Sequence, residues 1–320
     1  MLNYASAIGI DIGRNSLKIA VVKTGGEIVA SRSYSINKVK SRDQLLTKLF
    51  EAIHDIRQAV FSESINPISI GIAAKGFIDN QSGIVLGPDQ GIKNWTNVPL
   101  AKLVNDETGL PAFVDNDANM MTIAEHRFGA ARGFKNVIFV ALRSGIGGGI
   151  IINGKLHRGV ANASGEIGQM IIKYDGEASD IGIVGTFEHH ASASAVVRRY
   201  NEEISGTQIS MEGRFGCKDI FELSYNGSPE AVKVVKENAE IVGIGLVNLI
   251  SIFAPEIIIV GGGMSEAHIS YFTMIKNKAI ANSLFKYRSE VKIEKADLGS
   301  KAAFMGSAYY SLNRLAGKTL

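Results

Sequence analysis

The stretch VDNDANMMTIA, residues 114–124, leads directly from an apolar strand into a helix and carries its polar side chains at the junction. The pattern predicts that the strand closes before Asp115 and that residues 118–127 form the helix. Asp115, Asn116 and Asp117 then stand at a helix N-terminus, where Asn and Asp are preferred caps and negative charge is stabilised. Capping alone would explain these residues. A carboxylate at this place can also take a proton from a hydroxyl group.

Composition sets broad limits on what the chain can be. Its 320 residues are enough for two domains, and 46% hydrophobic with 20% charged residues is ordinary for a globular protein. The net charge of +3 gives no basic stripe, so we expect no nucleic-acid partner. The single cysteine, Cys217, excludes an internal disulfide and fits a cytoplasmic protein. The N-terminus has no signal-peptide pattern, and the longest apolar run, 241–255, is too short to span a bilayer, so we expect no membrane partner.

Residues 7–22 and 137–152 share one pattern, in which an apolar strand, a glycine turn with small polar residues and a second apolar strand follow one another. This weak repeat predicts two similar α/β halves that face one cleft. Strands alternate with helical patterns elsewhere, so we expect mainly parallel strands. We place the domain boundary at Asp117, between a small domain of residues 1–117 and a larger one of residues 118–299. The last helix, about 300–320, is expected to pack back on the first domain.

Two helix starts have clear signals. Ser41 with Gln44 resembles a capping box, and apolar residues recur after it at helical spacing. Ser228 followed by Pro229 predicts the start of a second helix, which runs to about Phe253.

Glycine turns follow three of the expected strands, at residues 11–16, 144–149 and 261–263. Glycine lets the backbone approach a ligand, and the N–H groups of such turns can hold phosphate oxygens. The chain has neither a GxxxxGK[ST] nor a GxGxxG motif, so it is not a P-loop protein and a dinucleotide-binding site is disfavoured. The three turns therefore indicate a nucleotide site of another type.

The motifs resemble those of sugar kinases of the ROK family, within the actin-like ATPase and hexokinase superfamily, over nearly the whole chain. DIGRNSLK, LRSGIGGG and IIIVGGGMS, starting at residues 11, 142 and 257, resemble the family's two phosphate motifs and its adenosine motif. VDNDAN resembles the catalytic segment. GEIGQM at 165–170 and GTFEHHAS at 185–192 resemble the two sugar-binding stretches.

The resemblance implies a two-domain actin-like (ribonuclease H-like) α/β fold with an interdomain cleft. It also implies an ATP- and Mg²⁺-dependent transfer of phosphate to a sugar hydroxyl, the 6-hydroxyl of a hexose or hexose derivative. Asp117 would be the general base, and Asp11 would hold Mg²⁺ through water. The implied sugar ligands are Gly76, Asn116, Glu166, Gln169 and Glu188. The implied ATP-binding residues are Asp11, Gly13, Asn15, Lys18, Ser144, Gly145, Gly147, Gly261, Gly262 and Gly263. Family members are often homodimers.

Blander interpretations remain for some of these residues. Alone, Glu166 fits an exposed turn residue, and Glu188 fits a first-turn acid that complements a helix dipole. Arg14 could meet a phosphate or simply lie exposed in its turn.

Departures from the family pattern leave the substrate open. Gln169 stands where a histidine commonly touches sugar and binds zinc, so a kinase for an amino sugar, a β-glucoside or a cyclitol is an alternative. Another is a catalytically silent sugar sensor. ROK repressors add an N-terminal DNA-binding domain, and the first strand here begins near residue 7, which we take to leave no room for one.

The remaining three zinc positions hold Ser179, Ile181 and Thr186, none of which is a zinc ligand here. We therefore expect no zinc site, and expect residues 174–188 to be anchored by apolar side chains: Ile181, Ile183, Val184 and Phe187.

The chain should fold without zinc, because a structural zinc site normally contributes directly to folding and this one lacks its ligands. Elemental analysis of protein purified without chelators should give no stoichiometric zinc. After EDTA treatment and dialysis, Mg²⁺ alone should restore activity. Activity that returns only with zinc would contradict the prediction.

Overall fold

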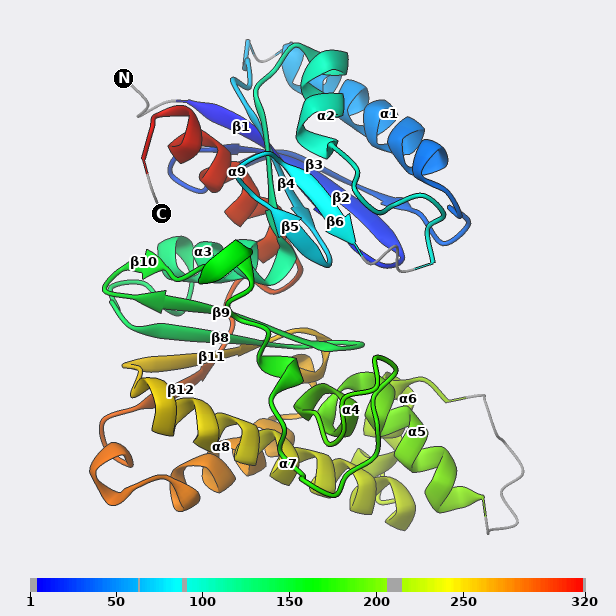
Figure 1. Ribbon diagram of the computed structural model, residues 1–320, viewed down its shortest axis with the longest axis vertical. Helices are drawn as coiled ribbons and strands as arrows, with labels where there is room; N and C mark the ends of the chain where they lie inside the picture. The colour runs from blue at the N-terminus through cyan, green and yellow to red at the C-terminus, as the bar shows by residue number, and fades with distance from the viewer. Residues whose placement is uncertain (1–4, 63, 88–90, 206–214, 319–320) are drawn as a thin grey trace. The chain divides into compact units, whose positions relative to one another are not determined.

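The computed structural model describes residues 5–62, 64–87, 91–205 and 215–318. These residues form a mixed α/β fold with two five-stranded sheets (Figure 1). Contacts divide the chain into two compact units. The first contains the described parts of residues 1–133, 150–164 and 298–320, and the second those of residues 134–149 and 165–297.

The sheet of the first unit has five strands in the order β3-β2-β1-β4-β7. Their bounds are β1 Ser6–Ile12, β2 Ser16–Lys23, β3 Ile28–Ser35, β4 Ile70–Ala74 and β7 Ala112–Asn116. β2 is antiparallel to both its neighbours, whereas β1, β4 and β7 are parallel. Parallel strands end at one edge of a sheet. In this register Asp11 of β1 pairs with Ala73 of β4, which pairs with Asp115 of β7.

The described residues of this unit also contain the α-helices α1 Arg42–Phe61, α2 Leu100–Thr108, α3 Asp117–Phe128 and α9 Ala302–Leu315, and the hairpin of β5 Phe77–Asp79 and β6 Ile84–Gly87. Ser41 caps this helix as predicted, since its Oγ accepts from the Gln44 N–H at 3.4 Å. The reciprocal bond of a capping box is not formed, because the Gln44 side chain accepts from the Lys40 N–H at 2.8 Å instead. The apolar residues at helical spacing in α1 are buried with Ile8 and Ile10 of β1. α9 packs against β1 and β4 from the opposite face.

Glycines allow α9 to lie directly on its neighbours. A Cβ atom on Gly9 would overlap the carbonyl oxygen of Phe304, and one on Gly71 would overlap that of Ser307. Within α9, a Cβ on Gly306 would overlap the carbonyl oxygen of Met120 in α3. The last helix therefore contacts both the first sheet and the helix that follows β7.

The second sheet has the order β10-β9-β8-β11-β12, with β8 Val137–Leu142, β9 Ile146–Ile152, β10 Lys155–Leu156, β11 Ile257–Gly261 and β12 Lys292–Lys295. Counted along the chain, the strand order 3-2-1-4-5 is the same in both sheets, and β8, β11 and β12 are parallel as β1, β4 and β7 are. The repeat seen in the sequence is thus confirmed as a repeat of topology. The division of contacts between the units falls within β9.

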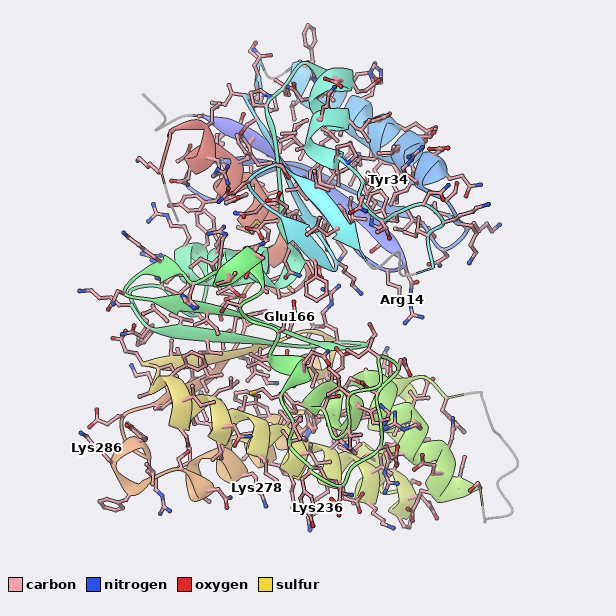
Figure 2. The ribbon with its side chains drawn as sticks, in the orientation of Figure 1. Arg14, Tyr34, Glu166, Lys236, Lys278 and Lys286 are labelled. Atoms are coloured by element: carbon pink, nitrogen blue, oxygen red, sulfur yellow. The ribbon has the colours of Figure 1, made fainter. Side chains whose placement is uncertain are left out.

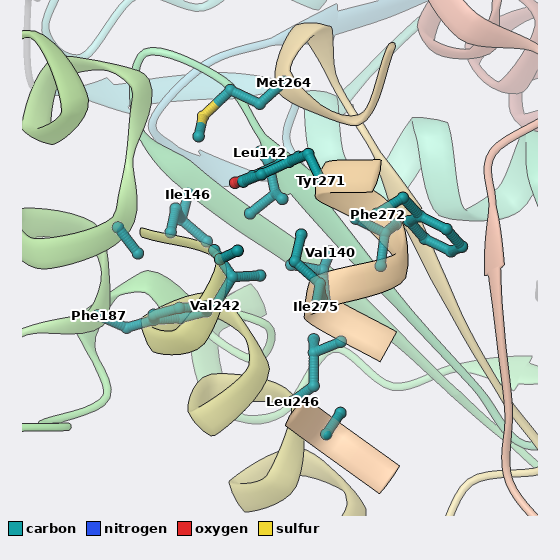
Figure 3. Close-up of a cluster of buried hydrophobic side chains, with 14 of the residues drawn as sticks. Val140, Leu142, Ile146, Phe187, Val242, Leu246, Met264, Tyr271, Phe272 and Ile275 are labelled. Atoms are coloured by element: carbon teal, nitrogen blue, oxygen red, sulfur yellow. The ribbon is translucent and has the colours of Figure 1, made fainter. Parts of the chain in front are cut away.

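The second unit has its own core, formed by its sheet and by α4 Phe187–Ala191, α5 Ala193–Ile204, α6 Cys217–Tyr225, α7 Pro229–Phe253 and α8 Ile269–Asn282. Figure 3 shows side chains of β8, α7 and α8 meeting in it, among them Val140, Val242 and Ile275. α7 begins at Pro229 and ends at Phe253, as predicted. Among the described residues, no helix is both long and apolar enough to cross a membrane.

The observed grouping differs from the expected domain boundary in two places. α3 groups with the first unit because it packs on α9, although the sequence analysis assigned residues after Asp117 to the larger domain. Residues 150–164 also group with the first unit, where Arg158 and Asn162 hydrogen-bond to Asp115.

Replacing Gly71 with alanine should destabilise the protein by roughly 1–3 kcal/mol, because an added methyl group must push α9 away from β4. The matched control is Gly25→Ala, since nothing lies within 4 Å of a Cβ atom there. Denaturant unfolding of both variants measures the effect. Equal stability of Gly71→Ala and wild type would show that α9 does not lie this close to the sheet.

Candidate functional site

The junction of β7 and α3 has no turn, so the last strand residue caps the helix that follows. Asn116 Oδ1 accepts from the backbone N–H groups of Ala118 at 2.8 Å and Asn119 at 3.4 Å. Its Nδ2 donates to the carbonyl oxygen of Gly76 at 3.1 Å. Two predicted sugar ligands, Gly76 and Asn116, are thus in direct contact. Capping is confirmed, and the same side chain fixes the loop after β4.

Asp117 is the first residue of α3, and only 8% of it is exposed. Its carboxylate lies in the first turn of the helix. A carboxylate shielded from water in this way is suited to accept a proton from a bound hydroxyl group.

The neighbouring carboxylate, Asp115, has a different environment. It is fully buried, and Arg158 pairs with it through an Nη2–Oδ2 distance of 2.8 Å. Asn119 and Asn162 donate to its Oδ1 at 3.1 and 3.0 Å. Asp115 therefore has a structural role, because its hydrogen bonds join β7, α3 and the loop at 158–162.

The first glycine turn lies at the same sheet edge as this junction. Asp11 is buried near the end of β1 and pairs in register with Lys18 of β2. Since neighbouring strands are about 4.8 Å apart, two strand spacings separate the backbones of Asp11 and Asp115, roughly 10 Å. Gly13 closes the turn by donating its N–H to the Ser16 carbonyl oxygen at 3.0 Å.

A cavity of about 330 Å³ adjoins this turn. Gly13 and Asn15 line it together with the side chains of Arg14, Lys40 and Lys75. Arg14 projects from the ribbon and is exposed (Figure 2). Among the described residues, the cavity lining contains three cations and no acidic side chain, so phosphate oxygens would be stabilised there.

The second glycine turn, between β8 and β9, is shorter than expected. Arg143 N–H donates to the Gly145 carbonyl oxygen at 2.9 Å, and β9 begins at Ile146. Gly147 therefore lies in a strand, not in the turn. Gly148 lies in the same strand. Glycine is needed at this position because a Cβ atom would overlap the side chain of Ile167.

The third turn completes a larger cavity within the second unit. Gly261 ends β11, and Gly262 has a φ of +92° and leaves no room for a Cβ atom beside the Leu142 carbonyl oxygen. Gly263 and Ser144 both line a cavity of about 850 Å³. The second and third turns are thus brought together at one pocket, large enough for a nucleotide.

The other wall of this cavity was not predicted from the sequence. Phe221 and Tyr225 of α6 line it, with His268 beyond the third turn. The rings of Tyr225 and His268 lie 4.6 Å apart. α6 carries no glycine motif, so only its place in the fold relates it to the pocket.

The predicted sugar ligands of the second unit also gather at the second turn. Glu188 Oε2 accepts from the Ile146 N–H at 2.7 Å, and a Cβ atom on Gly145 would overlap this carboxylate. Glu166 and Gln169 lie in one turn, where the Gln169 N–H donates to the Glu166 carbonyl oxygen at 3.0 Å. Glu166 is exposed (Figure 2). Gln169 Oε1 is buried and has no hydrogen-bond partner among the described residues.

The segment that would hold zinc in the family is fixed differently from our expectation. Of the four predicted apolar anchors only Phe187 is buried, and Ile181, Ile183 and Val184 are exposed, so the anchoring prediction was wrong for these three. Backbone bonds hold the segment instead, such as Gly185 N–H to the Glu177 carbonyl oxygen at 2.9 Å.

Polar side chains add to these backbone bonds. His189 Nε2 lies 3.1 Å from Glu177 Oε2, and this hydrogen bond holds the pKa of the Glu177 carboxyl below its usual value. Burial lowers the pKa of the neighbouring His190. In the described part of the chain, no three His, Cys, Asp or Glu side chains are grouped as metal ligands.

Known proteins match almost the whole chain. A glucokinase of Halalkalibacterium halodurans is 30% identical over 310 residues, which cover 94% of this chain and 93% of the relative. The xylose repressor of Caldicellulosiruptor bescii is 29% identical over 311 residues, 95% of this chain and 77% of the repressor.

Solved structures agree with these relatives. A ROK glucokinase from Streptomyces griseus, crystallised with glucose and AMPPNP, superposes with a TM-score of 0.84. It is 30% identical, and the match covers 97% of this chain and 100% of that one. The ROK family model matches residues 7–314. The chain belongs to the ROK family.

Proposed function

We propose that this protein is a sugar kinase that transfers the terminal phosphate of ATP to a sugar hydroxyl. The acceptor is the 6-hydroxyl of a hexose or hexose derivative. The observation that carries the proposal is the buried carboxylate of Asp117 at the start of α3, beside Asn116 and Gly76. The match to glucokinases over nearly the full length supports the reaction class.

Asp117 would take the proton of the attacking hydroxyl as the new bond to phosphorus forms. Asn116, Gly76, Glu166, Gln169 and Glu188 would orient the sugar, since amides and carboxylates bind hydroxyl groups directly.

The nucleotide would use the three glycine turns. The cations at the first turn, among them Arg14 and Lys75, favour phosphate there. The 850 Å³ cavity beside Ser144 and Gly263 is suited to the adenosine part. Mg²⁺ would neutralise phosphate charge, and the carboxylate oxygens of Asp11 are ligands of the kind that this ion prefers.

A catalytically silent sugar sensor is the second candidate, because the relatives include xylose repressors. A screen of ADP release over hexoses, amino sugars, β-glucosides and cyclitols separates the two. Turnover of any one of these supports the kinase. Sugar binding with no ADP release across the panel would favour the sensor.

Asp117→Asn should lower kcat by roughly 10²–10⁴, the usual contribution of a positioned acid–base group. Binding of sugar and ATP should change much less, because the amide keeps the size of the side chain. Glu107→Gln, an exposed carboxylate of α2, is the matched control and should retain full activity. Near wild-type turnover by Asp117→Asn would remove this residue from the mechanism.

Gln169→Leu should raise the KM for the sugar by about 3–10-fold with a smaller effect on kcat, since one hydrogen bond contributes about 0.5–1.5 kcal/mol. The reason is that Gln169 Oε1 is buried without a partner among the described residues and would accept from a sugar hydroxyl. Steady-state kinetics with the sugar found in the screen measures both constants. An unchanged KM would mean that Gln169 does not touch the acceptor.

A further inference from the structure

A second large cavity, of about 840 Å³, lies in the first unit. The turn after β5, the loop at 158–162 and the end of α9 form its walls. Its volume is typical of a small-molecule pocket. None of the site residues predicted from the sequence lines it, so it is separate from the glycine turns and from Asp117.

The lining of this cavity is rich in cations. Arg158, Arg314 and Lys318 face one acidic residue, Asp79. The Asp79 carboxylate accepts from the N–H of Gln81 at 3.0 Å and from the N–H and hydroxyl of Ser82, so it is engaged by its own turn. The Ser82 hydroxyl keeps the pKa of Asp79 below its usual value.

Among the described residues, one of the three cations has a carboxylate partner. Arg158 pairs with Asp115. Within the described parts of the chain, no carboxylate lies within 4.0 Å of the charged groups of Arg314 or Lys318. Arg314 Nη1 instead donates to the Tyr310 hydroxyl at 2.8 Å and to the Asn80 carbonyl oxygen at 3.2 Å. The positive charges of Arg314 and Lys318 are therefore not paired with a carboxylate of the described residues.

A buried tyrosine holds the two arginines in place. The guanidinium groups of Arg158 and Arg314 lie 5.4 and 5.7 Å from the centre of the Tyr310 ring. Burial raises the pKa of Tyr310, so its hydroxyl remains neutral and accepts from Arg314. Cation–π contacts and this hydrogen bond fix the donors before any ligand arrives, which lowers the entropic cost of binding.

An amide adds hydrogen-bonding capacity. Asn162 lines the cavity, and its Nδ2 donates to Asp115 and to the Ile78 carbonyl oxygen at 3.0 Å. Its Oδ1 is buried with no partner among the described residues. Buried acceptors are normally satisfied, so a ligand hydroxyl or a water is expected to donate here.

We propose that this cavity binds a small phosphate-bearing anion, with Arg314 and Lys318 contacting the phosphate and Asn162 accepting from a hydroxyl group. Guanidinium and ammonium groups are the side chains best suited to phosphate oxygens. The phosphate can come from a sugar phosphate or from free inorganic phosphate. The proposal does not depend on the kinase reaction, because it concerns binding alone.

Isothermal titration of the full chain with glucose 6-phosphate, inorganic phosphate and glucose tests this. The variants are Lys318→Glu, an exposed residue whose change should not affect folding, and Arg314→Gln. Lys286→Glu is the control, an exposed lysine of the second unit with the same change of charge (Figure 2). Circular dichroism confirms folding of each variant.

The phosphate ligand should bind wild type and Lys286→Glu equally, and Lys318→Glu about tenfold more weakly, since close charge pairs contribute strongly at binding sites. The affinity for glucose should be the same in Lys318→Glu as in wild type. Tighter binding of glucose 6-phosphate than of inorganic phosphate identifies a sugar phosphate, and equal or weaker binding identifies the free anion. Two results would overturn the proposal. One is no binding of either phosphate at concentrations up to about 10 mM, well above a Kd of about 1 mM. The other is affinity unchanged in both Arg314→Gln and Lys318→Glu.

Discussion

The buried charge of Asp115 is the constraint around which the first unit is arranged. Burying a charged carboxylate away from water costs free energy of folding unless the group is paired and fully hydrogen-bonded. Here Oδ1 accepts from the Asn116 N–H, Asn119 Nδ2 and Asn162 Nδ2, and Oδ2 accepts from Nε and Nη2 of Arg158. The donors come from β7, from α3 and from the loop at 158–162. One side chain therefore joins three segments, and each must be in place for the charge to be tolerated.

That arrangement determines how the adjacent residues can act. Successive strand residues point to opposite faces, so the inward direction of Asp115 turns Asn116 toward the loop after β4. Asn116 then caps α3 and binds Gly76 with opposite ends of one amide. Asp117 follows as the first helical residue. Its position is thus fixed by its two neighbours on the N-terminal side, which are held by the backbone and by buried donors.

Much of this follows from local patterns, and the rest does not. The start of α3, the capping of α1 by Ser41 and the glycines after β1 and β11 are readable because their signals lie within a few residues. The second turn misleads for a physical reason, since glycine is needed in β9 for close packing against Ile167 as well as for a turn. The bond from Ile146 to Glu188 joins residues far apart in the chain and leaves no local signal. The same holds for the exposed Ile181, whose loop is held by backbone bonds that no side-chain pattern reveals.

The contact between α9 and β1 has a consequence for how the protein is made. The first unit takes its earliest strand from residues 6–12 and its covering helix from residues 302–315. On the ribosome, the face of β1 and β4 that carries Gly9 and Gly71 has no covering helix until residues 302–315 have been made. Contacts between residues so distant in the chain also form slowly, because a long loop must close first. The segments of the second unit all lie between Phe134 and Asp297. This unit can therefore form its native contacts before α9 of the first unit has been synthesised.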